Sequence, residues 1–405
     1  MPPKVPVQQY SFSAGVLDPT MLGRLDIKAY YAGALTATNL TPLPLGGMSR
    51  RPGWRMVAEV PDAGAGARLA GFKYSSEAAY LLVLTSNLLR VFHADRLAAQ
   101  LVAPFSAAQL PAVDWCQQLA TMAMTHPDVA PKRLLRKGNH AAWAFDDVPL
   151  TGIPKFKFDG STEENVWSAS RGWPISVIFH QGRTYFGGSR AQPDWAWGSN
   201  AGDYWAFDER VVSSTDKTPL DDTAISASLG SSGGQVIRRM LATDDLFLFS
   251  DGGAWTATSG DGIKPDTFLP QLQSEVRAAL VRPVVVEGSV VYLSAGDDGA
   301  HSSVHELTWD DQAQGYYARD LALRCQSLMR SPVDMAVRLS SDGNSSATLL
   351  VVNGDGSVAV LTPNRFENLT AWTLWETAGQ VLAVAVVVNS VYLLVRRTIA
   401  GVVRY

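Results

Sequence analysis

Short apolar runs separated by turn residues dominate the chain. The run from Ala79 to Leu84 is followed by Thr85-Ser86-Asn87 and then by a second run from Leu88 to His93. Asn, Asp and Gly readily adopt the positive φ angles of tight turns, so this pattern predicts a β-hairpin. Further hairpins are predicted in the segments with the same pattern, at residues 246–258, 282–294, 348–361 and 381–395.

The last of these segments could also be taken for a membrane span. Residues 378–395 carry no charge, and their length approaches the roughly 18 to 20 residues that a spanning helix needs. However, the run from Val381 to Val388 is rich in β-branched residues, and Asn389-Ser390 interrupts it. We therefore predict two buried strands here.

Helix signals are few. Asp18 is a good N-cap before Pro19, which suits the first helical position, and a short helix is expected there. The sequence predicts a mainly β protein with a propeller-like or multi-sheet hairpin architecture and an N-terminal arm that contains the short helix. Residues 1–55 are expected to form this arm and residues 56–405 the body, with an inserted subdomain around residues 100–180.

A second short helix is expected within that stretch. Ser106 and Gln109 have the spacing of a capping box, and they precede an alanine-containing run. Alternation from Leu119 to Met124 indicates that a strand follows.

Composition excludes several classes of protein. The 405 residues include 34 Lys and Arg against 38 Asp and Glu, a balance that argues against a nonspecific nucleic-acid binder. Cys116 and Cys325 have no close partner in sequence, which excludes a disulfide framework and a cysteine-based zinc cluster. The N-terminus lacks an apolar stretch of signal-peptide length, so no export signal is predicted.

Candidate metal sites are weak. His301 and His305 are four residues apart in an expected loop, where this spacing does not place both rings on one face. The segments Asp342-Gly343-Asn344 and Asn353-Gly354-Asp355-Gly356 resemble fragments of calcium loops but lack the closing glutamate, so turns are the better interpretation. We expect no metal, no cofactor and no catalytic residue.

Two features keep a carbohydrate-related function open. Acidic pairs at Asp146-Asp147, Glu163-Glu164 and Asp221-Asp222 could serve a glycosidase only if the fold brought two carboxylates to catalytic separation. A dense aromatic cluster could be either a sugar platform or, as we prefer, a packing or interface cluster, because Trp and Tyr favour both settings. Its members are Trp195, Trp197, Tyr204, Trp205 and Phe207.

A set of short motifs between residues 10 and 53 resembles the opening of the tail nozzle proteins, or tail tubular proteins B, of short-tailed bacteriophages. Further matches follow at His126-Pro127-Asp128, Arg183 to Ser189 and Trp372 to Trp375. The resemblance implies that the residues of the first set of motifs make assembly contacts. They are Phe12, Gly15, Gly23, Arg24, Asp26, Tyr30, Asn39, Gly46, Gly47, Arg50, Arg51, Pro52 and Gly53.

The resemblance implies a non-enzymatic structural protein of the virion. It would form a homohexameric ring at the distal end of the viral tail, through which DNA is ejected into the host. The implied partners are the head-to-tail adaptor, tail fibres or spikes, double-stranded DNA in transit and the host envelope, with assembly in the host cytoplasm. The alternative from another class is a propeller or sandwich carbohydrate-binding protein or glycosidase.

Overall fold

The chain is a mainly β protein with a propeller-like, multi-sheet hairpin architecture. The computed structural model describes residues 9–43, 46–213, 215–216, 218–230, 233–257, 262–296, 302–339, 347–364 and 369–405. Within these ranges, the only helices are five short 3₁₀ turns. The chain forms two compact units. Unit 1 comprises Met1–Pro61, Val284–Glu306 and Arg319–Tyr405, and unit 2 comprises Asp62–Pro283 and Leu307–Ala318.

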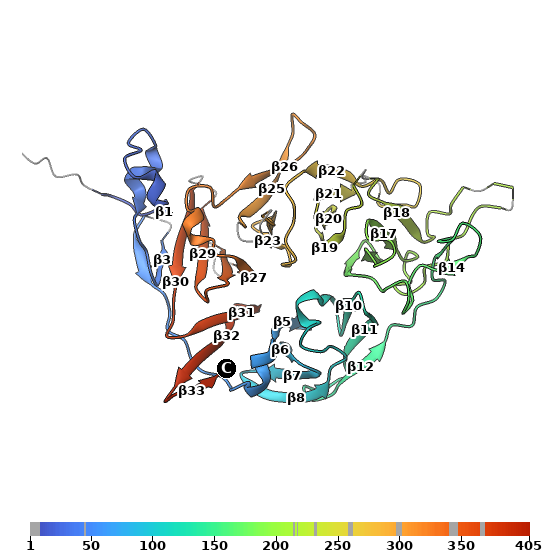
Figure 1. Ribbon diagram of the computed structural model, residues 1–405, viewed down its shortest axis with the longest axis horizontal. Helices are drawn as coiled ribbons and strands as arrows, with labels where there is room; N and C mark the ends of the chain where they lie inside the picture. Colours follow the sequence, from blue (N-terminus) through green and yellow to red (C-terminus); the bar gives the residue numbers. More distant parts are fainter. Residues whose placement is uncertain are drawn as a thin grey trace, which may run out of the picture. The chain divides into compact units, whose positions relative to one another are not determined.

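Unit 2 contains four antiparallel four-stranded sheets, and in each the strands follow one another in sequence order. The first sheet consists of β5 (Arg68–Lys73), β6 (Ala79–Thr85), β7 (Leu88–His93) and β8 (Arg96–Val102). The second consists of β9 (Asp114–Gln118), β10 (Thr121–His126), β11 (Val129–Arg136) and β12 (Trp143–Asp147). In Figure 1, β8 and β12 lie at the outer edge of this unit.

The other two sheets of unit 2 have the same order. The third consists of β15 (Ser176–His180), β16 (Arg183–Gly187), β17 (Trp195–Gly198) and β18 (Ile225–Ser228). The fourth consists of β19 (Ile237–Ala242), β20 (Leu246–Ser250), β21 (Gly253–Ala257) and β22 (Gln271–Ser274). The first strands of the second, third and fourth sheets pack together, because β15 contacts both β9 and β19. A separate two-stranded hairpin joins β13 (Lys155–Phe156) to β14 (Glu164–Asn165).

Unit 1 contains a six-stranded sheet in the order β2-β1-β30-β29-β28-β27. Its members are β1 (Gly15–Val16), β2 (Gly33–Ala34), β27 (Pro332–Arg338), β28 (Thr348–Asn353), β29 (Val358–Asn364) and β30 (Leu369–Trp375). A three-stranded sheet contains β31 (Gln380–Val387), β32 (Ser390–Ile399) and β33 (Val402–Arg404). The strands β3 (Leu40–Pro42) and β4 (Met48–Arg50) form a hairpin.

One further sheet has the order β23-β24-β25-β26. Its strands are β23 (Val284–Val286), β24 (Ser289–Leu293), β25 (Val304–Asp310) and β26 (Gly315–Asp320). The boundary between the two units falls within β25 and β26.

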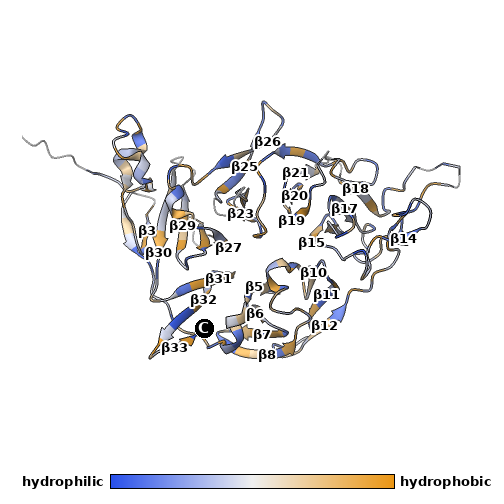
Figure 2. Cartoon of the chain, viewed as in Figure 1, coloured by the Kyte–Doolittle hydropathy of each residue, from blue (hydrophilic) through white to orange (hydrophobic). Residues whose placement is uncertain are grey.

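Apolar residues are concentrated in the strands (Figure 2). Central strands such as β20 and β28 are buried along their whole length, because both faces are covered. This explains why they appear in the sequence as continuous apolar runs without polar alternation.

The predicted hairpins are confirmed. Each of the five segments forms an antiparallel pair, including β31 with β32 where the sequence could be mistaken for a membrane span. No helix in the described ranges has the length and apolar character needed to cross a bilayer.

The two expected short helices are replaced by 3₁₀ turns, η1 (Pro19–Met21) and η4 (Leu110–Ala112). Asp18 caps η1 (Pro19–Met21), and a further turn, η2 (Lys28–Ala32), follows. The capping-box residues are also paired, since the backbone N–H and Oγ of Ser106 donate to Gln109 Oε1 over 2.9 and 3.0 Å. The strand expected after them is β10.

Candidate functional site

The N-terminal segment, residues 9–60, lies beside a strand from the other end of the chain. β1 pairs in parallel with β30 on one side and with β2 on the other (Figure 1). Gly15, opposite Trp372, has a φ of 64°. A Cβ at this position would lie 2.4 Å from the backbone nitrogen of Trp372 and 2.5 Å from its carbonyl oxygen. The close approach of the two strands therefore requires glycine at position 15.

A second attachment joins the segment to the end of β30. Asn39 donates its backbone N–H to the carbonyl of Leu374, and its Oδ1 accepts from the backbone N–H of Glu376 at 3.0 Å. Arg51 donates from Nε to the same Oδ1 at 2.7 Å and from Nη2 to the carbonyl of Glu376 at 3.0 Å. The Arg51 guanidinium also lies over the ring of Trp54, 4.9 Å from its centroid. Asn39 and Arg51 thus fix the path of the segment.

Asp18 provides a third attachment. Its Oδ1 accepts from the N–H and hydroxyl of Thr20 at 2.9 and 2.7 Å, and its Oδ2 accepts from the N–H of Ser327 at 3.0 Å. These hydrogen bonds, those from Thr20 above all, lower the pKa of Asp18 to about 2. The carboxylate form is therefore the one that holds η1 against the chain near Ser327.

We expect the N-terminal segment to loosen in acid. Because the folded pKa of Asp18 is depressed, its contribution is complete above about pH 4 and is lost as the pH falls toward 2. The contribution should be about 1 kcal/mol, since the carboxylate is partly exposed. Urea unfolding of the wild type and of Asp18→Asn between about pH 5 and pH 2 measures it. Stability curves that stay parallel across this range would show that Asp18 contributes no charge-dependent stability.

The same segment exposes large apolar side chains. Leu22, Leu25 and Leu35 are 62%, 61% and 61% exposed, and Tyr31 is 52% exposed. The Tyr31 hydroxyl donates to the carbonyl of Leu25 at 3.2 Å, which keeps two of these residues together. We call Leu22, Leu25, Tyr31 and Leu35 the N-terminal apolar surface. Each leaves on the order of 100 Å² in water, which sums to several hundred Å² within one short segment.

Polar side chains border this surface. Arg24 and Asp26 form an exposed ion pair with Nη2 and Oδ2 2.8 Å apart, and Lys28 is also exposed. An apolar centre with a charged rim is the usual anatomy of a protein interface.

The remaining motif residues of the segment are more scattered. Gly46 is buried and accepts from the N–H of Phe12, whereas Gly23 has a φ of 85° with open space around it. The other members are half-buried or exposed. They are Phe12, Tyr30, Gly47, Arg50, Pro52 and Gly53.

The aromatic cluster lies in the interior of unit 2. Trp197 and Phe207 are fully buried, and Trp195 and Trp205 are half-buried and pack against the same cluster. Tyr204 is also half-buried, and its hydroxyl accepts from Gln118. The centre of the cluster is a residue that the sequence analysis did not single out. Trp167 contacts Phe186, Trp197 and Phe207, with ring centroids 5.3, 5.3 and 5.0 Å apart.

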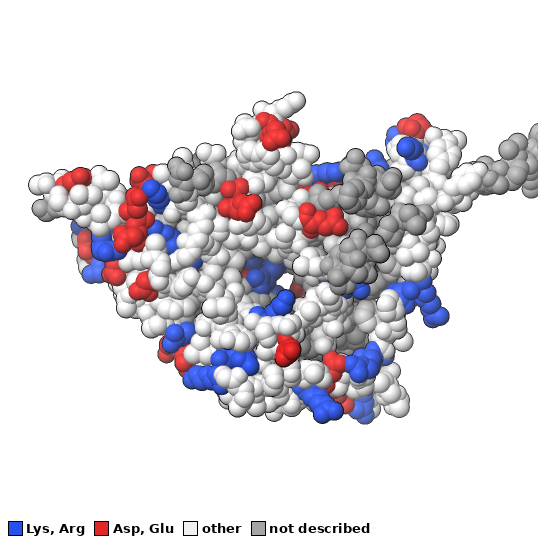
Figure 3. All heavy atoms as spheres, turned by 180° about the vertical axis from the view of Figure 1, so that it is seen from behind, with Lys and Arg blue, Asp and Glu red and all other residues white. Residues whose placement is uncertain are grey.

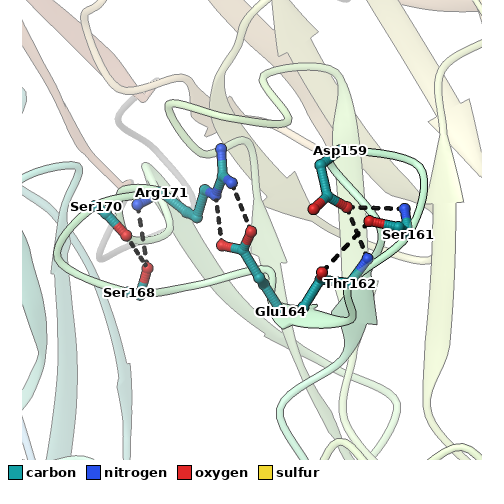
Figure 4. Close-up of polar contacts among 7 residues, drawn as sticks. All are labelled: Asp159, Ser161, Thr162, Glu164, Ser168, Ser170 and Arg171. Carbon is teal, nitrogen blue, oxygen red and sulfur yellow. Dashed lines mark hydrogen bonds and ion pairs between the residues drawn. The ribbon is translucent and has the colours of Figure 1, made fainter.

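Five of the six carboxylates in the acidic pairs face a basic side chain. Glu164 accepts two hydrogen bonds from Arg171, at 2.8 and 3.0 Å, beside the turn in which Asp159 accepts from Ser161 and Thr162 (Figure 4). The hydrogen bonds from Arg171 lower the pKa of Glu164, which is opposite to the raised pKa of a glycosidase general acid. Four other carboxylates of the acidic pairs likewise face a cation. The pairs are Asp146 with Lys137, Asp147 with Lys132, Asp221 with Lys264 and Asp222 with Arg210.

The candidate metal ligands do not assemble in the described part of the chain, which contains no group of three or more His, Cys, Asp or Glu side chains with metal-binding geometry. His301 and Asp342-Gly343-Asn344 lie outside the described residues. The segment Asn353 to Gly356 is a turn, as predicted, in which Ser357 donates to Asp355.

Comparison with known proteins does not define a family for this chain. No protein-family model and no curated protein matches the chain. The solved structure of BBS1N in complex with ARL6DN covers 86% of this chain and 91% of its own, at 11% identity and a TM-score of 0.45.

Two other solved structures give similar values. The WD40 repeats of RRP9 cover 81% of this chain and 88% of their own, with 8% identity and a TM-score of 0.43. The β-propeller domain of Cps50 (Swd1) from Myceliophteria thermophila covers 73% and 83%, with 10% identity and a TM-score of 0.43. At these values a shared function does not follow, so the fold assignment rests on the sheets described above.

The tail nozzle interpretation is wrong. The solved structures named above are BBS1N, the WD40 repeats of RRP9 and the β-propeller domain of Cps50 (Swd1), and none of these three is a phage tail protein. The partners implied by that interpretation are wrong as well. They were a hexameric ring of this chain, the adaptor, the tail fibres, DNA in transit and a host envelope. Many of the motif residues are Gly, Pro, Asn or Asp, which unrelated β proteins commonly use in turns. The virion location implied by the same resemblance stays an untested prediction.

Proposed function

We propose that this chain is a binding module, not an enzyme, and that it recognises a protein partner through the N-terminal apolar surface. The observation that carries the proposal is the exposure of Leu22, Leu25, Tyr31 and Leu35 within one short segment. Side chains of this size are costly to leave in water, and burying them against a partner would recover about 1.5 to 3 kcal/mol for each.

The attachment of the segment supports this role. Tyr31 lies in η2, Leu22 and Leu25 lie between η1 and η2, and Leu35 directly follows β2. Gly15, Asp18 and Asn39 attach this segment to the rest of unit 1. A surface that is already ordered loses little conformational entropy when it binds. Figure 3 shows both acidic and basic side chains on the face opposite to that of Figure 1.

Site-specific photo-crosslinking in the native cell tests the proposal. A benzophenone side chain at position 25 should give an adduct of defined mass with one partner protein. Leu22→Asp in the same chain should reduce the adduct by about tenfold or more, because a charge next to a buried anchor opposes binding.

Position 97 provides the matched control. Leu97, in β8 of unit 2, is 50% exposed and lies outside the N-terminal segment. A benzophenone there should give no such adduct. Identical adducts from both positions, an adduct insensitive to Leu22→Asp, or an adduct of twice the chain's own mass would contradict the proposal.

A further inference from the structure

Unit 2 contains a cluster of arginines around one buried aspartate. Asp114 is the first residue of β9, and Arg239 lies in β19. β15 packs between these strands and contributes Ser176, its first residue. Arg282 comes from the connection between β22 and β23. The packing of three first strands thus brings together residues that are far apart in sequence.

The aspartate faces two guanidinium groups. Oδ2 of Asp114 accepts hydrogen bonds from Ser176 Oγ at 2.6 Å and from the backbone N–H of Val177 at 3.2 Å. Oδ1 lies 3.3 Å from Nε of Arg282 and 3.8 Å from Nε of Arg239. One negative charge therefore opposes two positive charges.

Arg239 carries a buried positive charge. Its side chain is 1% exposed. It donates to the carbonyls of Arg238 at 3.0 Å and Pro111 at 3.4 Å, while Nε has no hydrogen-bond partner among the described residues. Burial lowers the pKa of Arg239 to about 10; Asp114 raises it, and the nearby arginines lower it further. Arg239 is thus a buried cation with one donor left without an acceptor, which is costly.

Arg282 is held in place with its outer edge free. Its guanidinium carbon lies 4.5 Å from the ring centroid of Trp115, and that of Arg68 lies 5.1 Å from the same ring. The Arg282 side chain is 27% exposed, and its Nη atoms make no hydrogen bond with the described residues. A guanidinium fixed by stacking and an ion pair presents a planar pair of donors, which matches the geometry of an oxyanion.

We propose that Asp114, Arg239 and Arg282 form a binding site for a small inorganic oxyanion of the phosphate class. Arg282 donates to the anion through its Nη atoms, Arg239 supplies uncompensated positive charge from the interior, and Asp114 positions both. The carboxylate of Asp114 repels an anion, but it neutralises only one of the two guanidinium charges, so a net positive charge remains for the ligand. The site is independent of the N-terminal apolar surface.

Fluorine NMR of the full chain labelled with 5-fluorotryptophan tests the site. The resonance of Trp115, assigned from Trp115→Phe, should shift saturably with inorganic phosphate, because Arg282 stacks on this ring. We expect a dissociation constant of about 1 mM or lower. Chloride at matched ionic strength should produce no saturable shift.

Variants separate specific binding from general attraction. Arg282→Gln should weaken phosphate binding by about tenfold or more, since a charge-assisted hydrogen bond is lost. Arg282→Lys should also weaken it, because lysine keeps the charge but not the planar donors. Arg210→Gln is the matched control, an arginine of unit 2 paired with Asp222, and it should leave binding unchanged. No saturable shift by about 50 mM phosphate, or equal affinity in Arg282→Gln, would overturn the proposal.

Discussion

Replacing Trp167 by alanine should lower the free energy of unfolding of unit 2 by about 3 to 5 kcal/mol, the range for truncating a large buried aromatic residue. The side chain is 1% exposed, and three other aromatic rings pack edge to face against it. Alanine would leave a cavity that these rings cannot fill without leaving their own positions. Urea unfolding followed by near-ultraviolet circular dichroism measures the loss.

Trp309→Ala is the control for this prediction. Trp309 is 43% exposed, contacts the ring of Tyr316 and donates to Asp311 at 2.8 Å. Its removal should cost about 1 kcal/mol, because little buried volume is lost. If the two variants were destabilised equally, Trp167 would not be the centre of the packed cluster.

Gly15→Ala should detach the N-terminal segment from β30. An alanine here must adopt a left-handed φ and place its Cβ against backbone atoms of Trp372, which cannot rotate away. We expect a cost of about 2 to 4 kcal/mol from the two effects together. Amide hydrogen exchange at residues 14–18 should then become faster, while exchange in β28 should change little.

Gly23→Ala distinguishes backbone conformation from steric contact. Gly23 also has a positive φ, 85°, but no atom lies within 4 Å of the place where its Cβ would be. This variant should cost only about 1 kcal/mol. Equal exchange rates in the two variants would show that the approach of β1 to β30 does not depend on glycine.

The hairpins could be predicted because their determinants are local. In β6 and β7, for example, the strands are adjacent in sequence, and the turn before Leu88 contains Asn87 with a φ of 54°. The same reasoning could not find β1, which has two residues and therefore no periodicity. Its partner β30 is more than 300 residues away, so no local pattern in the sequence indicates the pairing.

The residues of the two proposed sites could likewise be predicted only where their determinants are local in sequence. Asn39 and Arg51 were singled out in the sequence, but their common partner, the end of β30, was not predictable from them. The cluster of Asp114, Arg239 and Arg282 was missed entirely, because each residue is an isolated charge in its own segment and only the packing of β9, β15 and β19 joins them. The exposed leucines carried no signal, since burial is decided by tertiary contacts.

The pairing of β1 with β30 has a consequence for the order of folding during translation. Residues 62–283 form most of unit 2 without interruption, so this unit can fold while synthesis continues. The N-terminal segment leaves the ribosome before unit 2, whereas its partner strand, residues 369–375, leaves only after unit 2. At typical synthesis rates this delay is roughly 20 to 70 s. Throughout that time the nascent N-terminus lacks its docking strand, which makes it a natural substrate for chaperones that bind exposed apolar chain.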